Sequence, residues 1–130
     1  PSLIQRRYEI VKKYDEPMDA MHIEHIQHVS DVYHSSAHLY MIRIPDISVE
    51  QRNEIITRMA ENGVATNVHY KPLPMMSGYK AYGWDIKDFP NAYHLYHNEI
   101  TLPLHTLLSD EDVEIVIQTL RSTLEEMKLL

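Results

Sequence analysis

Cysteine is absent from the chain of 130 residues, and only three residues are glycine. Without cysteine the chain has no disulfides, no thiolate metal ligands and no cysteine nucleophile, which fits a reducing, cytoplasmic setting. A loop that cradles phosphate needs clustered glycines, so three scattered ones argue against it. No apolar run approaches the ~18 residues that a membrane span needs, and the first residues lack the apolar core of a signal peptide. We therefore expect a cytoplasmic location and no membrane partner.

Positive charge is also scarce. The formal net charge is −7, with 12 lysines and arginines against 19 acidic residues. Domains that bind nucleic acid usually carry a basic face, so we expect no nucleic-acid partner. Hydrophobic residues make up 44% of the chain and charged residues 24%, a balance typical of one folded domain with its own core.

The hydrophobic periodicity and the turn residues predict alternating helices and strands. Residues 18–36 are polar and mostly irregular, with room for one short strand, and residues 71–88 form a long loop. Three segments are predicted to be strands: 37–45, 64–70 and 99–104. Four segments are predicted to be helices: 1–14 with Pro17 ending it, a helix capped by Ser48 that stops at Gly63, residues 90–97, and a last helix capped by Ser109 and Asp112. This order predicts an α+β fold, a small three-stranded sheet covered by helices.

The nine histidines raise the question of a metal site, above all His22, His25 and His28. A spacing of three residues places neighbours on opposite faces of a strand and about 60° apart around a helix, so three imidazoles do not converge on one ion. A structural or solvent-exposed role is favoured for them, and a solvated face is favoured for His94 and His97. We expect no metal site.

Three aromatic residues, Tyr79, Tyr82 and Trp84, lie in the long loop. They are either a stacking platform for a base or sugar, or large apolar groups that anchor the loop to the domain. The second interpretation is favoured.

His69, Tyr70 and Lys71 come where a predicted strand is forced to end, because Pro72 cannot donate to a strand ladder. Scaffolds commonly present functional side chains at such positions. The three residues could supply an acid or base, a hydroxyl donor and an ammonium group for phosphate. A turn that contains a buried histidine is the structural alternative, and the residues alone leave both open.

Four stretches together resemble the C-terminal part of the DegT family of nucleotide-sugar aminotransferases: "AHLYMIRI", "NGVATNVHYKPLP", "FPNA" and "ITLPLHTLLSDEDVEIVIQTL". The match covers residues 38–124, with its stretches in the family's order. The resemblance implies the aspartate aminotransferase fold and dependence on pyridoxal phosphate (PLP). It also implies that residues 1–17 are the end of an interdomain helix, and that residues 18–130 are a small domain whose large, PLP-binding partner domain belongs to the same, longer chain.

The resemblance assigns this domain to substrate positioning and active-site closure during amino transfer, with glutamate as the expected donor and a nucleotide-linked ketosugar as acceptor. It implies that His69, Tyr70, Lys71 and His38 contact the substrate. The Schiff-base lysine and the groups that hold PLP would lie in the large domain, so the chain alone is expected to bind no PLP and to be inactive. A homodimer is expected for the full-length enzyme.

Two positions depart from the family pattern. Pro74-Met75-Met76 stands where a histidine often follows the motif proline, which leaves the sugar open, and Tyr93 stands where an acidic residue is common. Two other functions remain from the residues alone. One is a free-standing α+β module that binds a small regulatory ligand, and the other is an interaction domain that uses the loop aromatics. The reading frame upstream of Pro1 separates these from an aminotransferase.

Overall fold

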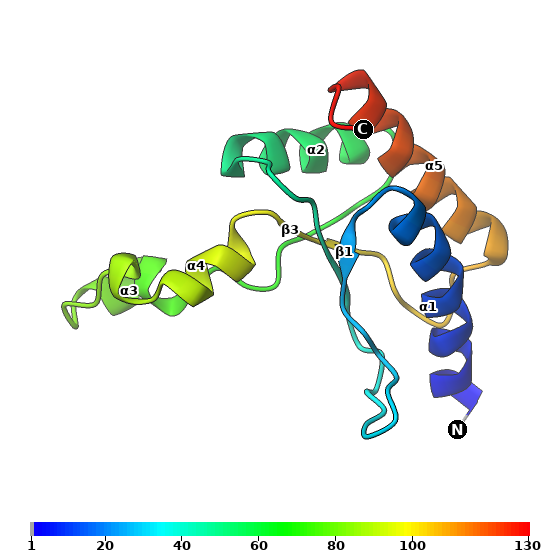
Figure 1. The fold of residues 1–130 in the computed structure, drawn as a ribbon, viewed down its shortest axis with the longest axis horizontal. Coiled ribbons are helices and arrows are strands. Elements are labelled where there is room, and N and C mark those ends of the chain that lie inside the picture. The colour runs from blue at the N-terminus through cyan, green and yellow to red at the C-terminus, as the bar shows by residue number, and fades with distance from the viewer. Residues whose placement is uncertain (1) are drawn as a thin grey trace.

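The computed structural model describes residues 2–130. Three antiparallel strands form one sheet in the order β1-β2-β3, and helices lie around it (Figure 1), so the prediction of an α+β fold with a small three-stranded sheet is confirmed. The strands are β1 (Glu24–His25), β2 (Tyr40–Arg43) and β3 (Glu99–Leu102). The helices are α1 (Ser2–Ala20), α2 (Val49–Glu61), α3 (Ser77–Lys80), α4 (Pro90–Tyr96), α5 (Asp110–Glu126) and the short 3₁₀ helices η1 (Leu73–Met75) and η2 (Ile86–Asp88).

One face of the sheet carries the hydrophobic core. Alternate strand residues point to opposite faces, and Tyr40 and Ile42 of β2 face the same core as Ile100 and Leu102 of β3. Helices α1, α2 and α5 supply most of the rest of that core, and residues between the elements complete it. The predicted apolar stripe of α5 is buried in full: Val113, Val116, Ile117, Leu120 and Leu124. The opposite, outer face of the sheet is left for polar residues.

Two helices begin at their predicted caps, and a third ends later than predicted. The capping boxes at Ser48 and Ser109 are both present, as predicted. The prediction that Pro17 ends the first helix is wrong, because α1 continues to Ala20. A proline within a helix forfeits one backbone hydrogen bond. Burial of Tyr14 and Met18, both 0% exposed, compensates by holding this part of α1 on the core.

The predicted strand 64–70 is wrong. Only one bridge forms there, in which Asn67 and Thr101 exchange backbone hydrogen bonds of 3.2 and 2.7 Å. Two residues later the backbone N–H of His69 donates to the carboxylate of Glu99, at 2.9 Å, and not to a backbone carbonyl of β3. A side chain therefore occupies the next rung of the ladder and ends the pairing. The third strand is instead the two-residue β1, within the segment predicted as mostly irregular.

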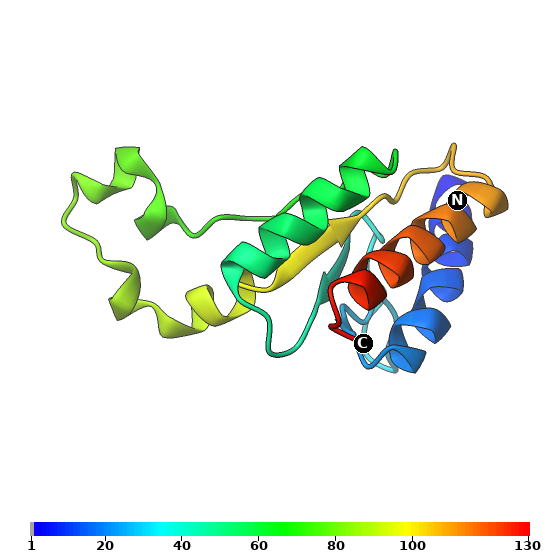
Figure 2. The same ribbon diagram turned by 90° about the horizontal axis from the view of Figure 1, so that it is seen from above.

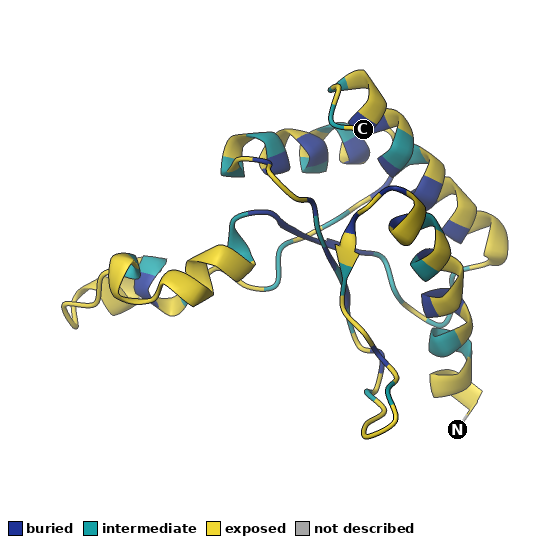
Figure 3. Cartoon of the chain, viewed as in Figure 1, coloured by how far each residue is buried: buried dark blue, intermediate teal, exposed yellow. Residues whose placement is uncertain are grey.

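Residues 71–97, here called the arm, project away from the body of the domain (Figures 1 and 2). The arm contains η1, α3, η2 and α4, so the predicted loop 71–88 holds short helices, and the helix predicted over 90–97 is confirmed as α4. Most of the arm is exposed (Figure 3).

The prediction that the loop aromatics anchor the arm to the domain is wrong. The rings of Tyr79 and Trp84 stack on each other with centroids 5.9 Å apart, and Tyr82 lies 5.9 Å from Trp84. None of the three belongs to the hydrophobic core of the described residues. Because the arm leaves the body, no core surface lies within their reach, and they pack against one another.

Candidate functional site

The outer face of the sheet carries a row of three charged residues and a histidine. The strand registers pair Glu24 with Arg43 and Arg43 with Glu99. The bridge between Asn67 and Thr101 extends this register by one strand and sets His69 opposite Glu99. Directly opposite residues of antiparallel strands share a face, so Glu24, Arg43, Glu99 and His69 form one row across the sheet.

A pocket of about 350 Å³ lies over this row. We call it the sheet pocket. It is lined by Glu24, His25, Ile26, Met41, Arg43, His69, Leu95 and Glu99. The lining therefore combines apolar side chains with a few polar groups, the composition typical of a small-ligand site.

Arg43 connects three elements at the edge of the sheet pocket. Its guanidinium pairs with the Glu24 carboxylate at 3.0 Å and donates to the Asn98 side-chain oxygen at 3.2 Å. It also lies 3.1 Å from Nε2 of His94 on α4. An arginine can only donate, so His94 accepts through Nε2. With its donors taken by protein groups, Arg43 serves to fix α4 and the base of the arm to the sheet.

His69 is half-buried and is held from two directions. Its backbone N–H donates to Oε2 of Glu99 at 2.9 Å, and its Nδ1 lies 2.9 Å from Oγ1 of Thr101. The Thr101 hydroxyl donates to Oε1 of Glu99 at 2.5 Å. Glu99 itself is only 4% exposed. The imidazole therefore has a fixed orientation beside the pocket.

The charge of Glu99 is set by opposing effects. Burial raises its pKa, whereas the hydrogen bonds from Thr101 and from the His69 N–H lower it, as do the positive charges of His69 and Arg52. The net direction of the pKa is upward. Arg52 is 2% exposed and donates to the backbone carbonyl of Glu99 at 3.4 Å.

The other predicted site residues lie apart from the sheet pocket. Tyr70 is 69% exposed, and its ring meets that of His69 edge to face with centroids 4.6 Å apart. Lys71 is exposed and lines a different hollow, next to Trp84 on the arm. His38 is exposed two residues before β2. The structure thus brings together His69 and Tyr70, and it places neither Lys71 nor His38 in the pocket lining.

The spaced histidines do not converge. His22 is exposed, His25 lies 3.3 Å from an oxygen of Asp15 and 3.0 Å from one of Asp19, and His28 is buried with Nδ1 2.7 Å from the Ser35 hydroxyl. Burial lowers the pKa of His28. Within residues 2–130 no three histidine, aspartate or glutamate side chains are grouped as metal ligands.

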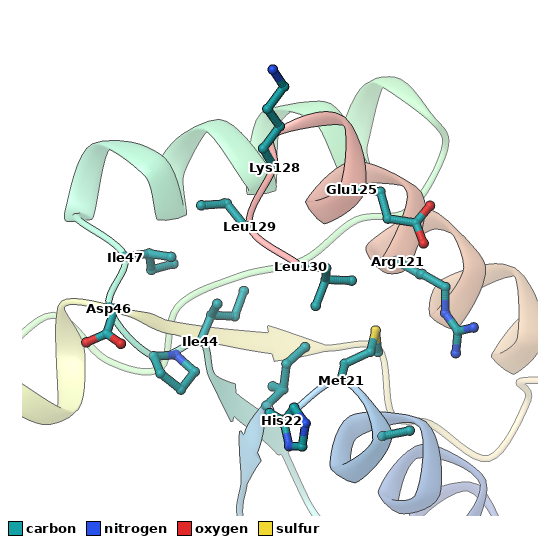
Figure 4. Close-up of a pocket in the computed structure, with 13 residues that line it drawn as sticks. Met21, His22, Ile44, Asp46, Ile47, Arg121, Glu125, Lys128, Leu129 and Leu130 are labelled. Atoms are coloured by element: carbon teal, nitrogen blue, oxygen red, sulfur yellow. The ribbon is translucent and has the colours of Figure 1, made fainter.

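A larger pocket, of about 820 Å³, lies between the segment after α1, the segment after β2 and the C-terminal end of the chain. Figure 4 shows His22, Asp46, Arg121, Glu125 and Lys128 around it, with Leu129 and Leu130. None of the four predicted site residues lines it. His22, Asp46, Glu125 and Lys128 are exposed at this pocket, and Arg121 is half-buried. Because the sheet pocket contains His69, we take it as the candidate site. No helix in the described part of the chain is both long enough and apolar enough to span a bilayer.

Sequence reasoning missed Glu99 and Thr101. The signal was present, because "EITL" alternates polar and apolar residues with the period of a strand. That pattern alone places Glu99 and Thr101 together on one face. Contact with His69 required the pairing between residues 67 and 101, which no local pattern specifies.

The comparison with protein families matches residues 1–121 to the DegT/DnrJ/EryC1/StrS aminotransferase family. The chain belongs to this family. It is 31% identical to UDP-4-amino-4,6-dideoxy-N-acetyl-beta-L-altrosamine transaminase of Campylobacter jejuni, over 96% of this chain and 33% of that protein. It is 32% identical to the spore coat polysaccharide biosynthesis protein SpsC of Bacillus subtilis, over 90% of this chain and 31% of that protein.

Solved structures agree. The PLP form of the sugar aminotransferase Spr1654 of Streptococcus pneumoniae superposes with a TM-score of 0.94 at 47% identity, covering 100% of this chain and 33% of that one. The chain therefore spans about a third of the length of the relatives it matches. Transaminase activity and dependence on PLP are the properties of this family.

The residues described here do not fit a complete PLP site. PLP enzymes hold the cofactor through a lysine, with an acidic or arginine partner at the ring nitrogen. Every lysine of the chain is exposed, and none lines the sheet pocket. A Cβ built on any of the three glycines meets nothing within 4 Å, so none of them marks a tight phosphate cradle. No chemical step is assigned to the cofactor in this domain.

Proposed function

We propose that the chain is the C-terminal small domain of a PLP-dependent aminotransferase that acts on a nucleotide-linked ketosugar. The observation that carries this proposal is the match of the whole chain, at 47% identity, to about one third of a sugar aminotransferase in its PLP form. The names of other relatives include transaminases of UDP-linked and dTDP-linked sugars. Residues 1–17 belong to the end of an interdomain helix that continues into the domain, and residues 18–130 form the small domain.

In this proposal the domain positions substrate and excludes water, and the covalent chemistry belongs to a large domain of the same longer chain. His69 lines the sheet pocket and Tyr70 stands exposed beside it, which supports their contact with the sugar nucleotide. Lys71 and His38 are exposed and lie outside that pocket, so they contact the substrate from the rim. Holding reactants in a fixed geometry can supply a large share of a rate enhancement.

The full-length enzyme takes glutamate as amino donor, works as a homodimer in the cytoplasm, and loses activity when reduced to this chain. To test the function, the protein encoded by the continuous reading frame is purified with PLP. It is then incubated with glutamate and a UDP-linked or dTDP-linked ketosugar, and mass spectrometry follows the nucleotide sugar. We expect an aminosugar nucleotide together with 2-oxoglutarate.

Two results would contradict the proposal. One is a reading frame that adds no lysine-bearing PLP domain, which would favour a free-standing ligand-binding module. The other is a full-length protein that binds PLP but transfers no amino group to either class of nucleotide ketosugar.

A further inference from the structure

Three polar groups form a continuous chain of hydrogen bonds behind the sheet pocket: the Glu99 carboxylate, the Thr101 hydroxyl and the His69 imidazole. The successive distances are 2.5 Å from Thr101 Oγ1 to Glu99 Oε1 and 2.9 Å from His69 Nδ1 to Thr101 Oγ1. The Glu99 end of this series of hydrogen bonds is fixed as well, because Oε2 of Glu99 accepts the His69 backbone N–H at 2.9 Å.

The direction of this chain follows from counting protons. A carboxylate only accepts, so both of its short contacts are donated to it. The Thr101 hydroxyl has one proton, and that proton goes to Glu99. Oγ1 can then contact His69 only as an acceptor, so Nδ1 of the imidazole carries a proton. In the neutral ring the other nitrogen, Nε2, is left with a lone pair, and it makes no hydrogen bond within residues 2–130.

The burial of Glu99 is explained by its place in this series of hydrogen bonds. A carboxylate that is 4% exposed is costly to bury unless it is hydrogen-bonded, and an apolar residue would fill the same space at lower cost. Burial raises the pKa of Glu99 and favours the protonated form, and the hydrogen bonds from the Thr101 hydroxyl and the His69 N–H, with the charge of Arg52, act in the opposite direction and favour the carboxylate. The buried carboxylate is therefore less stabilising than an apolar residue would be, and its role is to set which ring nitrogen of His69 carries the proton.

We propose that Glu99 and Thr101 are positioning residues that hold His69 in the Nδ1–H tautomer and so present Nε2 to the sheet pocket as a hydrogen-bond acceptor. An acceptor recognises O–H or N–H groups, so His69 binds a hydroxyl or amino group of the sugar, and phosphate oxygens have to be bound elsewhere. The role toward substrate rests on the proposed function, whereas the tautomer does not.

The tautomer is tested by NMR of the chain labelled with [¹⁵N]histidine, at a mildly alkaline pH above the range in which free imidazole titrates. Ring nitrogens with and without a proton have well-separated ¹⁵N shifts. We expect the wild-type His69 signal to show a proton on Nδ1. The informative variant is Glu99→Gln. The amide oxygen of the glutamine has to accept the His69 backbone N–H, so its NH₂ group faces the Thr101 hydroxyl. The hydroxyl then turns and donates to Nδ1 of His69, and the ring proton moves to Nε2.

Two controls isolate the effect. Glu24→Gln makes the same chemical change in the same row of the sheet. Glu24 contacts Arg43 and does not belong to the series of hydrogen bonds, so the ring proton of His69 should stay on Nδ1. Thr101→Ser keeps the hydroxyl and should keep the tautomer as well. Thermal unfolding of each variant verifies that the fold is intact.

Kinetics of the full-length enzyme connect the tautomer to substrate. Glu99→Gln should lower kcat/KM for the nucleotide sugar by about 10-fold, the scale of one lost positioning contact. Glu114→Gln, the same chemical change at an exposed position of α5 outside the lining of the sheet pocket, should stay near wild type. A proton on Nε2 in the wild type, or a tautomer unmoved by Glu99→Gln, overturns the inference whatever the activity. If Glu99→Gln changes the tautomer as expected but leaves kcat/KM unchanged, the proposed role of His69 toward the sugar is wrong and the tautomer assignment is retained.

Discussion

At the scale of single residues, the outer face of the sheet is organised by charge. Glu24, Arg43 and Glu99 alternate in sign along one row that ends at His69, and the partners of Arg43 connect the arm to the sheet. Glu99 is the most buried charged member, so its environment determines what His69 can do. The end of a strand-like run predicted His69 and Tyr70 as site residues. It did not identify Glu99 and Thr101, because their role depends on a contact about 30 residues distant along the chain.

The raised pKa of Glu99 gives stability a defined pH dependence. Because burial keeps the folded-state pKa above the ordinary value of 4.5, the folded state takes up a proton at a higher pH than the unfolded state does. The contribution of Glu99 to the free energy of unfolding is therefore fully present below about 4.5 and is lost as pH rises through the raised pKa. Arg52 and His69, which face Glu99, moderate this effect.

Urea unfolding of the wild type and of Glu99→Gln at a series of pH values checks this prediction. The free energy of unfolding of the wild type should rise relative to that of the variant as pH falls toward 4.5. A difference between wild type and Glu99→Gln that shrinks as pH falls would contradict the direction of the pKa shift.

At the scale of elements, the helices follow local signals and the sheet does not. Caps and apolar stripes lie within a few residues of one another, so α2, α4 and α5 were predictable from short windows of sequence. Residues 64–70 look like a strand locally, yet the side chain of Glu99 takes the rung that the backbone of β3 would have offered. This competition between a side chain and a backbone carbonyl cannot be predicted before the strand register is known. The same holds for Pro17, whose cost is offset by distant core contacts of α1.

The cap of α5 offers a direct test at this scale. Ser109 accepts from the N–H of Asp112 at 3.0 Å, and the Asp112 carboxylate accepts from the N–H of Ser109 at 2.8 Å. Ser109→Ala removes one side of this box and should lower the free energy of unfolding by about 1 kcal/mol. Ser122→Ala, an exposed change within α5, should be neutral or slightly stabilising, because alanine has the higher helix propensity. Equal urea midpoints for Ser109→Ala and wild type would show that the cap contributes nothing.

At the scale of the whole molecule, the domain has one compact side and one extended side. Helices α1, α2 and α5 enclose the core, while the arm extends from the edge of the sheet that also carries His69 (Figure 2). The resemblance of four sequence stretches predicted the family, and the match over residues 1–121 confirms that the chain belongs to it. The direction of the arm had no counterpart in any local pattern.

A second test concerns the division of labour between domains. Because every lysine of the chain is exposed and none lines the sheet pocket, the isolated chain should acquire no stoichiometric PLP label at any one lysine. The chain is mixed with PLP and reduced with borohydride, and the modified lysines are located by mass spectrometry. Weak labelling spread over several lysines is the expected result. Full labelling at a single lysine would mean that this chain carries a PLP site of its own.

The most direct test of the central claim compares kcat/KM with melting temperature for His69→Ala in the full-length enzyme. If His69 positions the nucleotide sugar, kcat/KM should fall about 10-fold or more. The free energy of unfolding should fall by no more than about 1 kcal/mol, because a half-buried histidine gives up one hydrogen bond and little packing. The exposed His105→Ala should change neither quantity. A large loss of stability, with unchanged kcat/KM of the enzyme that remains folded, would make His69 a structural residue and contradict the claim.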